Sequence, residues 1–178
     1  QANRKKIPVI IDPKGKDIDK YEGATLITPN RKEAMELTGL TNFNEDLLGT
    51  ALKKLSKKYK INSIVLTQGE DGISHITPRK IATYPAITSK QVYDVSGAGD
   101  TVIATLAACI IAKLDFADSF KLANLAAGIV ISKLGTVPIK NQELLDEIED
   151  NSNGQKNKIF TSNELLTKIT NLRSKNKT

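Results

Sequence analysis

Short apolar segments rich in β-branched residues alternate with segments of helical periodicity, and this alternation constrains the fold more than any other feature of the chain. Residues 7–12, 24–28 and 62–67 are continuous apolar runs, which predicts strands buried on both faces. Residues 30–38 and 45–59 carry apolar side chains at helical spacing and lie between these strands. We therefore expect a parallel sheet with crossover helices, the α/β class.

The pattern changes after residue 72. Two short strands, Ile73–Thr77 and Lys80–Tyr84, are joined by Pro78-Arg79, which predicts an antiparallel hairpin. A hairpin added to parallel strands makes the predicted sheet mixed.

Three further helices are predicted in the second half of the chain. The first follows a Gly-rich turn and ends near Lys113, and because it is apolar almost all round we expect it to be buried. The second spans about 119–133, with Asp118 as its N-cap and Gly135 as its C-cap. Residues 142–149 form the third.

The chain has the size of one globular domain. Its 178 residues, 39% of them hydrophobic, can bury a single substantial core. We expect residues 1–150 to form this domain and 151–178 to hold a linker and the start of a following segment, with a short polar helix at 163–172. Because the chain begins with Gln1 and enters a strand almost at once, we expect it to be a piece of a longer protein.

The net charge of +6 favours anionic substrates but does not indicate a nucleic-acid partner. Only four Phe, four Tyr and no Trp are present to stack on bases, and they are not interleaved with the basic residues. A solvated basic surface is the preferred interpretation.

Cysteine usage and hydropathy indicate a soluble, cytoplasmic protein without a membrane partner. The single Cys109 cannot form an internal disulfide and fits a reducing compartment. The apolar run 102–112 around it is too short to span a bilayer, and the N-terminal residues carry no signal-peptide pattern.

Several enzyme classes are excluded by absent residues. His75 is the only histidine, so neither a zinc cluster of several histidines nor a serine hydrolase triad built on one of several histidines is indicated. No Gly-x-x-x-x-Gly-Lys-Ser/Thr string occurs, and no Gly-x-Gly-x-x-Gly follows the first strand. P-loop and dinucleotide-binding folds are therefore not expected.

Residues 94–100, Asp-Val-Ser-Gly-Ala-Gly-Asp, form the most informative string. The N–H groups of Gly97, Ala98 and Gly99 would point out of a helix N-terminus, where the macrodipole favours negative charge. This arrangement predicts an anion hole. Asp100 would lie beside a bound phosphate, where a carboxylate is useful as a base that accepts a hydroxyl proton. The alternative, an ordinary turn with Asp100 complementing the helix dipole, stays open on these residues alone.

Two weaker strings precede it. Residues 67–72, Thr-Gln-Gly-Glu-Asp-Gly, could wrap a nucleotide phosphate or ribose, although a plain strand-to-hairpin turn explains them as well. Asn30-Arg31-Lys32-Glu33 matches a capping box, with Asn30 as N-cap. The functional alternative uses the Glu33 carboxylate to hold water around Mg²⁺.

Taken in this order, the Asn-x-x-Glu, Thr-x-Gly-x-x-Gly and Asp-x-Ser-Gly-Ala-Gly-Asp strings resemble those of the ribokinase-like (PfkB) carbohydrate kinases. The resemblance implies a three-layer α/β sandwich, with helices on both faces of a mostly parallel sheet and an antiparallel hairpin. Residues 1–150 would be its C-terminal, ATP-binding and catalytic part.

The same resemblance implies ATP and Mg²⁺ as cofactors, Asp100 as the catalytic base and Gly97, Ala98 and Gly99 as the anion hole. Glu33 would hold Mg²⁺ through water, and Asp94 and Ser96 would hold a monovalent cation such as K⁺. The implied ATP-binding residues are Asn30, Arg31, Lys32, Glu33, Thr67, Gly69, Gly72, Asn124, Ala127 and Gly128.

Residues 11–15, 21–30, 92–103 and 133–136 are more narrowly similar to D-glycero-β-D-manno-heptose 7-phosphate kinases, and the likeness covers about Pro8 to Glu149. It implies phosphorylation of the sugar phosphate at the anomeric O1, giving the 1,7-bisphosphate, in ADP-heptose and lipopolysaccharide core biosynthesis. Such kinases are often fused to an adenylyltransferase, and a homodimer is expected for the full-length protein.

Residues 159–166 resemble the connector to that second domain, and Ser96 stands where the family usually has Thr. The family's N-terminal half, with most sugar contacts, lies outside this sequence. The alternatives are another sugar or nucleoside kinase of the family, or a nucleotide-binding fragment without catalysis.

Overall fold

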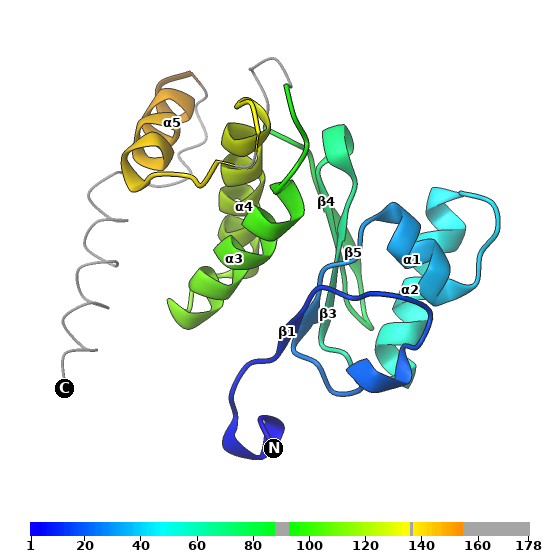
Figure 1. The fold of residues 1–178 in the computed structure, drawn as a ribbon. Helices are drawn as coiled ribbons and strands as arrows, with labels where there is room; N and C mark the ends of the chain where they lie inside the picture. Colours follow the sequence, from blue (N-terminus) through cyan, green and yellow to red (C-terminus); the bar gives the residue numbers. More distant parts are fainter. Residues whose placement is uncertain (88–92, 136, 155–178) are drawn as a thin grey trace. The chain divides into compact units, whose positions relative to one another are not determined.

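The computed structural model describes residues 1–87, 93–135 and 137–154 (Figure 1). The chain divides into two compact units, unit 1 with residues 1–86 and unit 2 with residues 87–178. The β-sheet lies in unit 1, and α-helices occur in both units.

The sheet of unit 1 is mixed, as predicted. Its strands are β1 (Ile10–Ile11), β2 (Leu26–Ile27), β3 (Ser63–Thr67), β4 (Ile73–Ile76) and β5 (Ile81–Tyr84), and they lie in this order. The first three run parallel, while β4 is antiparallel to β3 and β5 to β4. The α/β class and the hairpin are confirmed.

The first two strands are shorter than the predicted 7–12 and 24–28. Pro8 has no N–H to donate, and the Val9 N–H donates to the Thr25 hydroxyl at 2.9 Å instead of to a strand carbonyl. Regular ladder pairing therefore begins only after these residues.

Helices α1 (Arg31–Thr38) and α2 (Glu45–Lys58) pack against the sheet of unit 1 and follow the predicted bounds. Asn30 and Asn44 cap their N-termini with side-chain oxygens, and Gly39 ends α1 at φ 72°, a conformation that favours glycine. Short 3₁₀ helices occupy connections of this unit: η1 (Asn3–Lys5), η2 (Asp19–Tyr21) and η3 (Gly69–Asp71).

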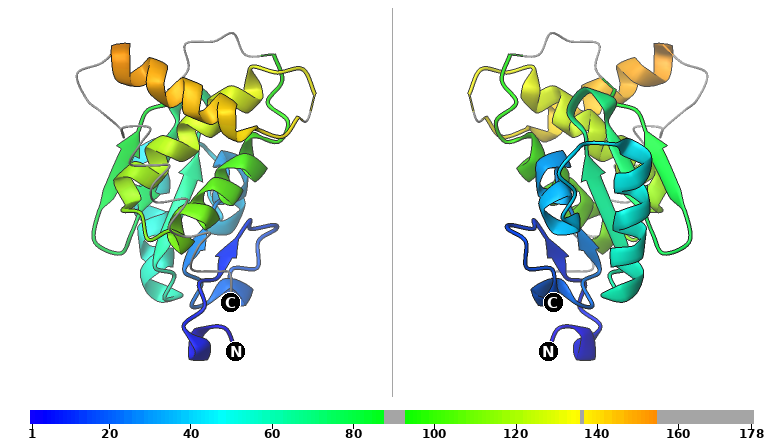
Figure 2. Two further views of the ribbon diagram at one scale, coloured as in Figure 1. Left: turned by 90° about the vertical axis from the view of Figure 1, so that its left-hand side faces the viewer. Right: turned by 90° about the vertical axis from the view of Figure 1, so that its right-hand side faces the viewer.

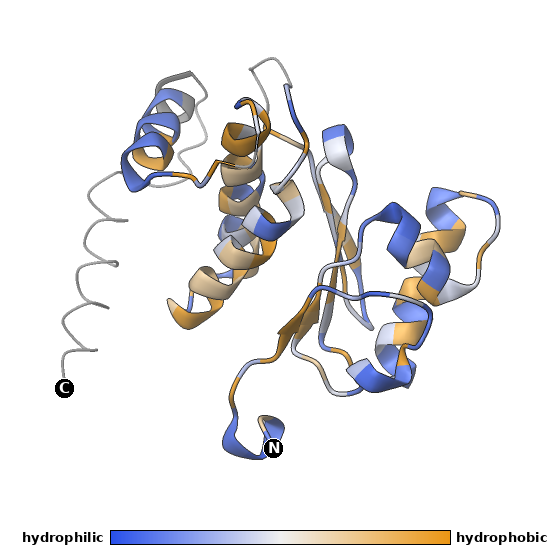
Figure 3. Cartoon of the chain, viewed as in Figure 1, coloured by the Kyte–Doolittle hydropathy of each residue, from blue (hydrophilic) through white to orange (hydrophobic). Residues whose placement is uncertain are grey.

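The core of unit 1 lies between these helices and the strands. Figure 3 shows mostly hydrophobic colours along the parallel strands, and a mixture of hydrophilic and hydrophobic residues in α1 and α2. Burying a large aliphatic side chain contributes about 1.5–3 kcal/mol, so this cluster anchors the helices to the sheet. Its fully buried members include Ile27, Ala34, Leu52, Ile61 and Ile64.

Unit 2 is helical in its described part, with α3 (Ala98–Ile111), α4 (Phe116–Ile131) and α5 (Asn141–Gly154). The first two lie side by side, and α5 packs on α4 (Figure 2). Ile148 of α5 is fully buried in a cluster with Cys109, Leu122 and Leu125.

Three predictions for these helices were wrong. Helix α4 is capped by Asp115, whose Oδ1 accepts the Asp118 N–H at 3.0 Å, and it ends at the cap Ser132 instead of Gly135. Helix α3 is not buried all round, because Ile111 is 66% exposed. It buries one face, with Val102, Leu106 and Cys109.

Helix α5 extends to Gly154, into the segment interpreted as a linker. The connector 159–166 and the predicted helix 163–172 lie outside the described residues. Among the described helices, none is long and apolar enough to cross a membrane.

Candidate functional site

The carboxyl ends of the parallel strands meet at one edge of unit 1. Asp12 follows β1, Asn30 lies shortly after β2, and Thr67 ends β3. Asn30 and Thr67 form a parallel bridge, and the Thr67 N–H donates to the Pro29 carbonyl at 3.0 Å. Open α/β sheets bind ligands at this kind of edge, and the fold brings the Asn-x-x-Glu and Thr-x-Gly-x-x-Gly strings together there.

The Asn-x-x-Glu string forms the complete capping box of α1. The Glu33 N–H donates to Asn30 Oδ1 at 3.0 Å, and the Asn30 N–H donates to Glu33 Oε2 at 2.9 Å. The other carboxylate oxygen, Oε1, accepts the Lys14 ammonium at 2.5 Å. Glu33 therefore caps the helix with one oxygen and bears a cation on the other.

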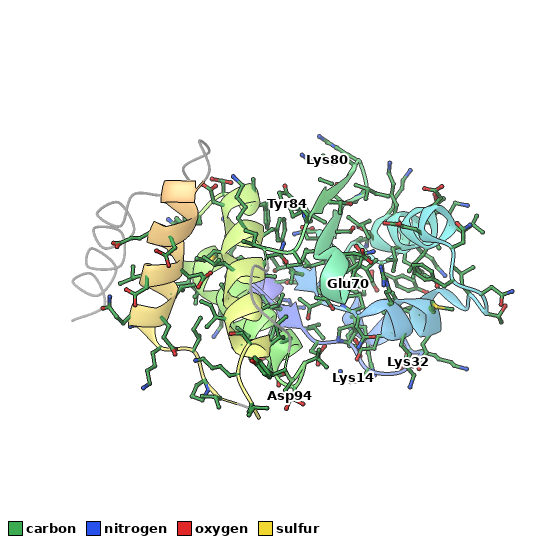
Figure 4. The ribbon with its side chains drawn as sticks, turned by 90° about the horizontal axis from the view of Figure 1, so that it is seen from above. Lys14, Lys32, Glu70, Lys80, Tyr84 and Asp94 are labelled. Carbon is green, nitrogen blue, oxygen red and sulfur yellow. The ribbon has the colours of Figure 1, made fainter. Side chains whose placement is uncertain are left out.

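Arg31 joins the two strings through a second contact. Its Nη2 pairs with Asp71 of η3, and its guanidinium lies 5.0 Å from the Phe43 ring centroid. Its buried Nε has no hydrogen-bond partner among the described residues. Lys32 is exposed on the same side of unit 1 as Lys14, opposite Lys80 at the hairpin tip (Figure 4).

A pocket of about 540 Å³ extends along α1. It is lined by Lys16, Arg31, Lys32, Met35 and Phe43, among others, and Asn30, Glu33 and Thr67 are not part of its wall. It is therefore separate from the strand edge.

The two glycines of residues 67–72 are required for different structural reasons. Both have positive φ, 62° for Gly69 and 84° for Gly72. A Cβ on Gly72 would lie 2.3 Å from the Tyr84 carbonyl oxygen, so this glycine permits close packing of the hairpin. A Cβ on Gly69 would meet nothing within 4 Å, which leaves its backbone open to a ligand.

Gln68 was missed by sequence reasoning. Its side chain is buried, with Oε1 accepting the Ser74 hydroxyl at 2.6 Å, and its Nε2 has no partner among the described residues. A buried unpaired amide is unusual, but a glutamine in a turn carries no local sequence signal of burial.

The Gly-rich string of unit 2 starts α3. Gly97 is the N-cap at φ 79°, and Asp100 is exposed in the first turn. The Ala98 N–H makes a long contact of 3.3 Å to the Val95 carbonyl, while the Gly97 and Gly99 N–H groups have no acceptor among the described residues. An accessible carboxylate thus lies beside backbone donors that can receive an anion.

The start of the same string is ordered by Asp94. Its Oδ1 accepts the Ser96 N–H at 2.8 Å, and this hydrogen bond is the chief cause that lowers the pKa of the Asp94 carboxyl. The Asp94 N–H donates to the Ile131 carbonyl at 3.2 Å, which ties the string to the end of α4. Whether Asp94 and Ser96 hold a cation stays a prediction.

The residues predicted on the adenine side lie in α4. Asn124 and Gly128 are buried, and Ala127 is partly exposed. Their role in binding stays a prediction. In the described residues no group of three or more His, Cys, Asp or Glu side chains could hold a metal ion.

A family model described as pfkB family carbohydrate kinase matches residues 1–143. The chain belongs to the pfkB family of carbohydrate kinases. The pfkB match covers all three strings, from Asn30 to Asp100. It confirms the family resemblance that these strings and their order predicted.

The chain is also similar to curated proteins named bifunctional protein HldE. The bifunctional protein HldE of Methylobacillus flagellatus is 43% identical over 174 residues, 97% of this chain and 36% of that protein. The bifunctional protein HldE of Campylobacter fetus is 44% identical over 158 residues, 89% of this chain and 34% of that protein. The chain spans about a third of the length of these relatives.

Solved structures show the ribokinase-like fold. Arabidopsis thaliana ribokinase, complexed with ribose and ATP, has a TM-score of 0.72 at 23% identity, covering 81% of this chain and 48% of that one. Escherichia coli phosphofructokinase-2, in complex with potassium, has a TM-score of 0.75 at 16% identity, covering 85% and 50%. The predicted fold is confirmed.

Proposed function

We propose that this chain is the ATP-binding, catalytic part of a carbohydrate kinase in which Asp100 is the general base. The observation that carries the proposal is the start of α3, where the exposed Asp100 lies beside N–H groups of Gly97 and Gly99 that have no acceptor among the described residues. Membership of the pfkB family supports the reaction class, transfer of phosphate to an alcohol group.

In the proposed reaction Asp100 accepts the proton of the acceptor hydroxyl as the oxygen of that hydroxyl bonds to the γ-phosphorus and ADP leaves. The amides at the start of α3 stabilise the charge on the transferred group, and the helix dipole adds to this effect. The turn, which needs the positive φ of Gly97, already holds these N–H donors in position before the phosphate binds. The backbone therefore has to reorganise little during the reaction.

Mg²⁺ fits the donors of unit 1. Glu33 Oε1 already accepts a cationic group, and Mg²⁺ keeps several waters when it bridges phosphates, so one carboxylate can hold it without a protein cage. Glu33 with Asn30 would hold the ion through water, where it would neutralise part of the phosphate charge. Arg31, Lys32, Thr67, Gly69, Gly72, Asn124, Ala127 and Gly128 are proposed to surround the nucleotide.

The proposed substrate is D-glycero-β-D-manno-heptose 7-phosphate, phosphorylated at the anomeric O1 in ADP-heptose and lipopolysaccharide core biosynthesis. The high identity to proteins named HldE supports it, as does the likeness of residues 11–15 and 21–30 to heptose 7-phosphate kinases. The bifunctional relatives also support a fused second domain, and residues 151–178 are proposed to hold the linker and the start of that following segment. A cytoplasmic homodimer is proposed for the full-length protein.

A monovalent cation, K⁺, is proposed at Asp94 and Ser96. The potassium complex of the Escherichia coli phosphofructokinase-2 supports this assignment, since its fold is shared.

The test is Asp100→Asn in the full-length protein, with Asp146→Asn on α5 as a matched control. Loss of the proton acceptor should lower kcat by about 10²–10⁴-fold and leave ATP binding by calorimetry intact, whereas the control should be unaffected. Near-normal turnover of Asp100→Asn would rule out the assigned base. ATP binding without transfer by the wild type would favour a non-catalytic module, and preference for an unphosphorylated sugar or a nucleoside would favour another member of the family.

A further inference from the structure

The loop after β1 holds Lys14 in a fixed position. The Lys14 N–H donates to the Tyr21 hydroxyl oxygen at 2.8 Å, and the Tyr21 hydroxyl donates to the Lys14 carbonyl at 3.0 Å. Lys20 Nζ donates to the same carbonyl at 3.0 Å. Because Tyr21 is buried in the core of unit 1, the backbone of Lys14 is anchored to that core.

The side chain of Lys14 lies between two carboxylates. Its Nζ is 2.5 Å from Glu33 Oε1 and 2.9 Å from Asp12 Oδ2. Its hydrogen bond to Glu33, followed by the one to Asp12, holds the pKa of Lys14 above its ordinary value. Most of the Lys14 side chain is exposed, so its ion pairs add little to the stability of the fold. Their effect is to fix the position of the Lys14 charge between the two carboxylates.

The capping box leaves Glu33 a single oxygen for other partners. Oε2 accepts the Asn30 N–H, and Oε1, the oxygen left for other partners, accepts the Lys14 ammonium. Removal of the ammonium would leave Glu33 and Asp12 facing each other's negative charge with no cation between them.

We propose that Lys14 is a positioning residue of the nucleotide site, which orients Glu33 Oε1 and offsets the charge of the Asp12–Glu33 pair. This inference rests on the proposed function. Metal–ATP is a net anion, so it should bind better when Lys14 is present. A free divalent cation is attracted by the bare carboxylates, so it should bind better when Lys14 is absent.

The two expected effects on binding have opposite signs, and they distinguish an electrostatic role of Lys14 from a merely structural one. The experiment uses the full-length protein with Lys14→Met, with Lys14→Arg as the conservative variant and with Lys16→Met as the matched control. Lys16 is exposed two residues away and makes no ion pair among the described residues. Mn²⁺ alone, followed by water-proton relaxation, reports metal affinity, and steady-state kinetics report KM for MgATP against kcat.

For Lys14→Met we expect Mn²⁺ affinity to rise about five- to tenfold and KM for MgATP to rise by a similar factor. We expect kcat to change less than about threefold. These sizes are typical of the removal of one charge at a partly exposed site. Lys14→Arg should restore both values, and Lys16→Met should match the wild type. A fall in both affinities, no change in either, or loss of kcat at constant KM would overturn the proposal.

The Mn²⁺ measurement distinguishes failure of the proposed function from failure of the proposed role of Lys14. A wild-type protein that binds Mn²⁺ but not ATP would contradict the proposed function, while tighter Mn²⁺ binding by Lys14→Met would still support the charge role of Lys14. Absence of Mn²⁺ binding in both proteins would overturn the role of Lys14 even if the kinase activity is present.

Discussion

His75 lies in β4 with its Nε2 2.9 Å from the Ser63 hydroxyl oxygen, and only 4% of its surface is exposed. Burial lowers the pKa of His75 to about 4, and the positive charge of Lys80 acts in the same direction. The imidazole is therefore neutral in the folded chain at neutral pH. It belongs to the packing of the sheet.

This histidine should make the folded state sensitive to mild acid. The unfolded chain takes up the proton near pH 6.5 and the folded chain only near pH 4, so stability present above pH 6.5 is lost as the pH falls between these values. Between pH 7 and 5 the free energy of unfolding should fall by about 2 kcal/mol from this group. Urea unfolding at both pH values measures it.

The matched variant is His75→Gln, which keeps a polar group toward Ser63 but cannot titrate. Its unfolding free energy should depend less on pH over the same range, even if the variant is less stable at pH 7. An equal pH dependence in both proteins would show that other groups cause the effect.

At the scale of elements, two acidic residues at the N-terminus of α4 have different structural roles. The Asp115 side chain accepts the Asp118 N–H, and this hydrogen bond is the chief cause that lowers the pKa of Asp115. Asp118 lies in the first turn, where its carboxylate is 3.5 Å from Lys121 Nζ. Asp115 is the cap, while Asp118 forms an ion pair with Lys121 and interacts with the helix dipole.

Asp115→Ala should therefore lower the free energy of unfolding by about 1 kcal/mol, the typical loss of an N-cap side chain. Asp118→Ala should cost less, because an ion pair between partly exposed side chains contributes little. Chemical denaturation of the two variants under identical conditions compares them directly. A larger loss for Asp118→Ala would contradict the cap assignment.

Helix ends were predictable where one capping residue stood alone. Asn30 and Gly39 mark the two ends of α1 without competitors, and both act as expected. Two aspartates precede the apolar part of α4, and either fits the cap pattern. The earlier start places Phe116 and Phe120 four residues apart on one face, where their rings stack at 5.8 Å, and this packing favours Asp115.

For the whole molecule, the proposed function assigns nucleotide-binding residues to each of the two units. Asn30 and Glu33 belong to unit 1, and Gly97 to Asp100 to unit 2. A ligand that binds only the folded state stabilises what it contacts, by about 2.7 kcal/mol at a hundredfold excess over Kd. Addition of MgATP to the full-length protein should thus slow amide hydrogen exchange at the starts of α1 and α3 together.

Hydrogen exchange with mass-spectrometric readout measures this, with the β4–β5 hairpin tip near Lys80 as an internal reference that should not change. Protection confined to one unit would contradict the nucleotide-binding role proposed for residues of the other unit. Loss of the response in Asp100→Asn would indicate that this residue contributes to binding as well as to catalysis.

The sequence by itself determined the local elements and the family. Strand runs, the capping box of α1, the hairpin and the order of the three strings depend on residues close together in the chain, and periodicity and capping are local properties. Tertiary structure decided the rest: the bridge between Asn30 and Thr67, the burial of Gln68 and the contact of Lys14 with Glu33. These contacts join residues from different elements, and the order of strands that brings the elements together results from long-range packing, which no local pattern encodes.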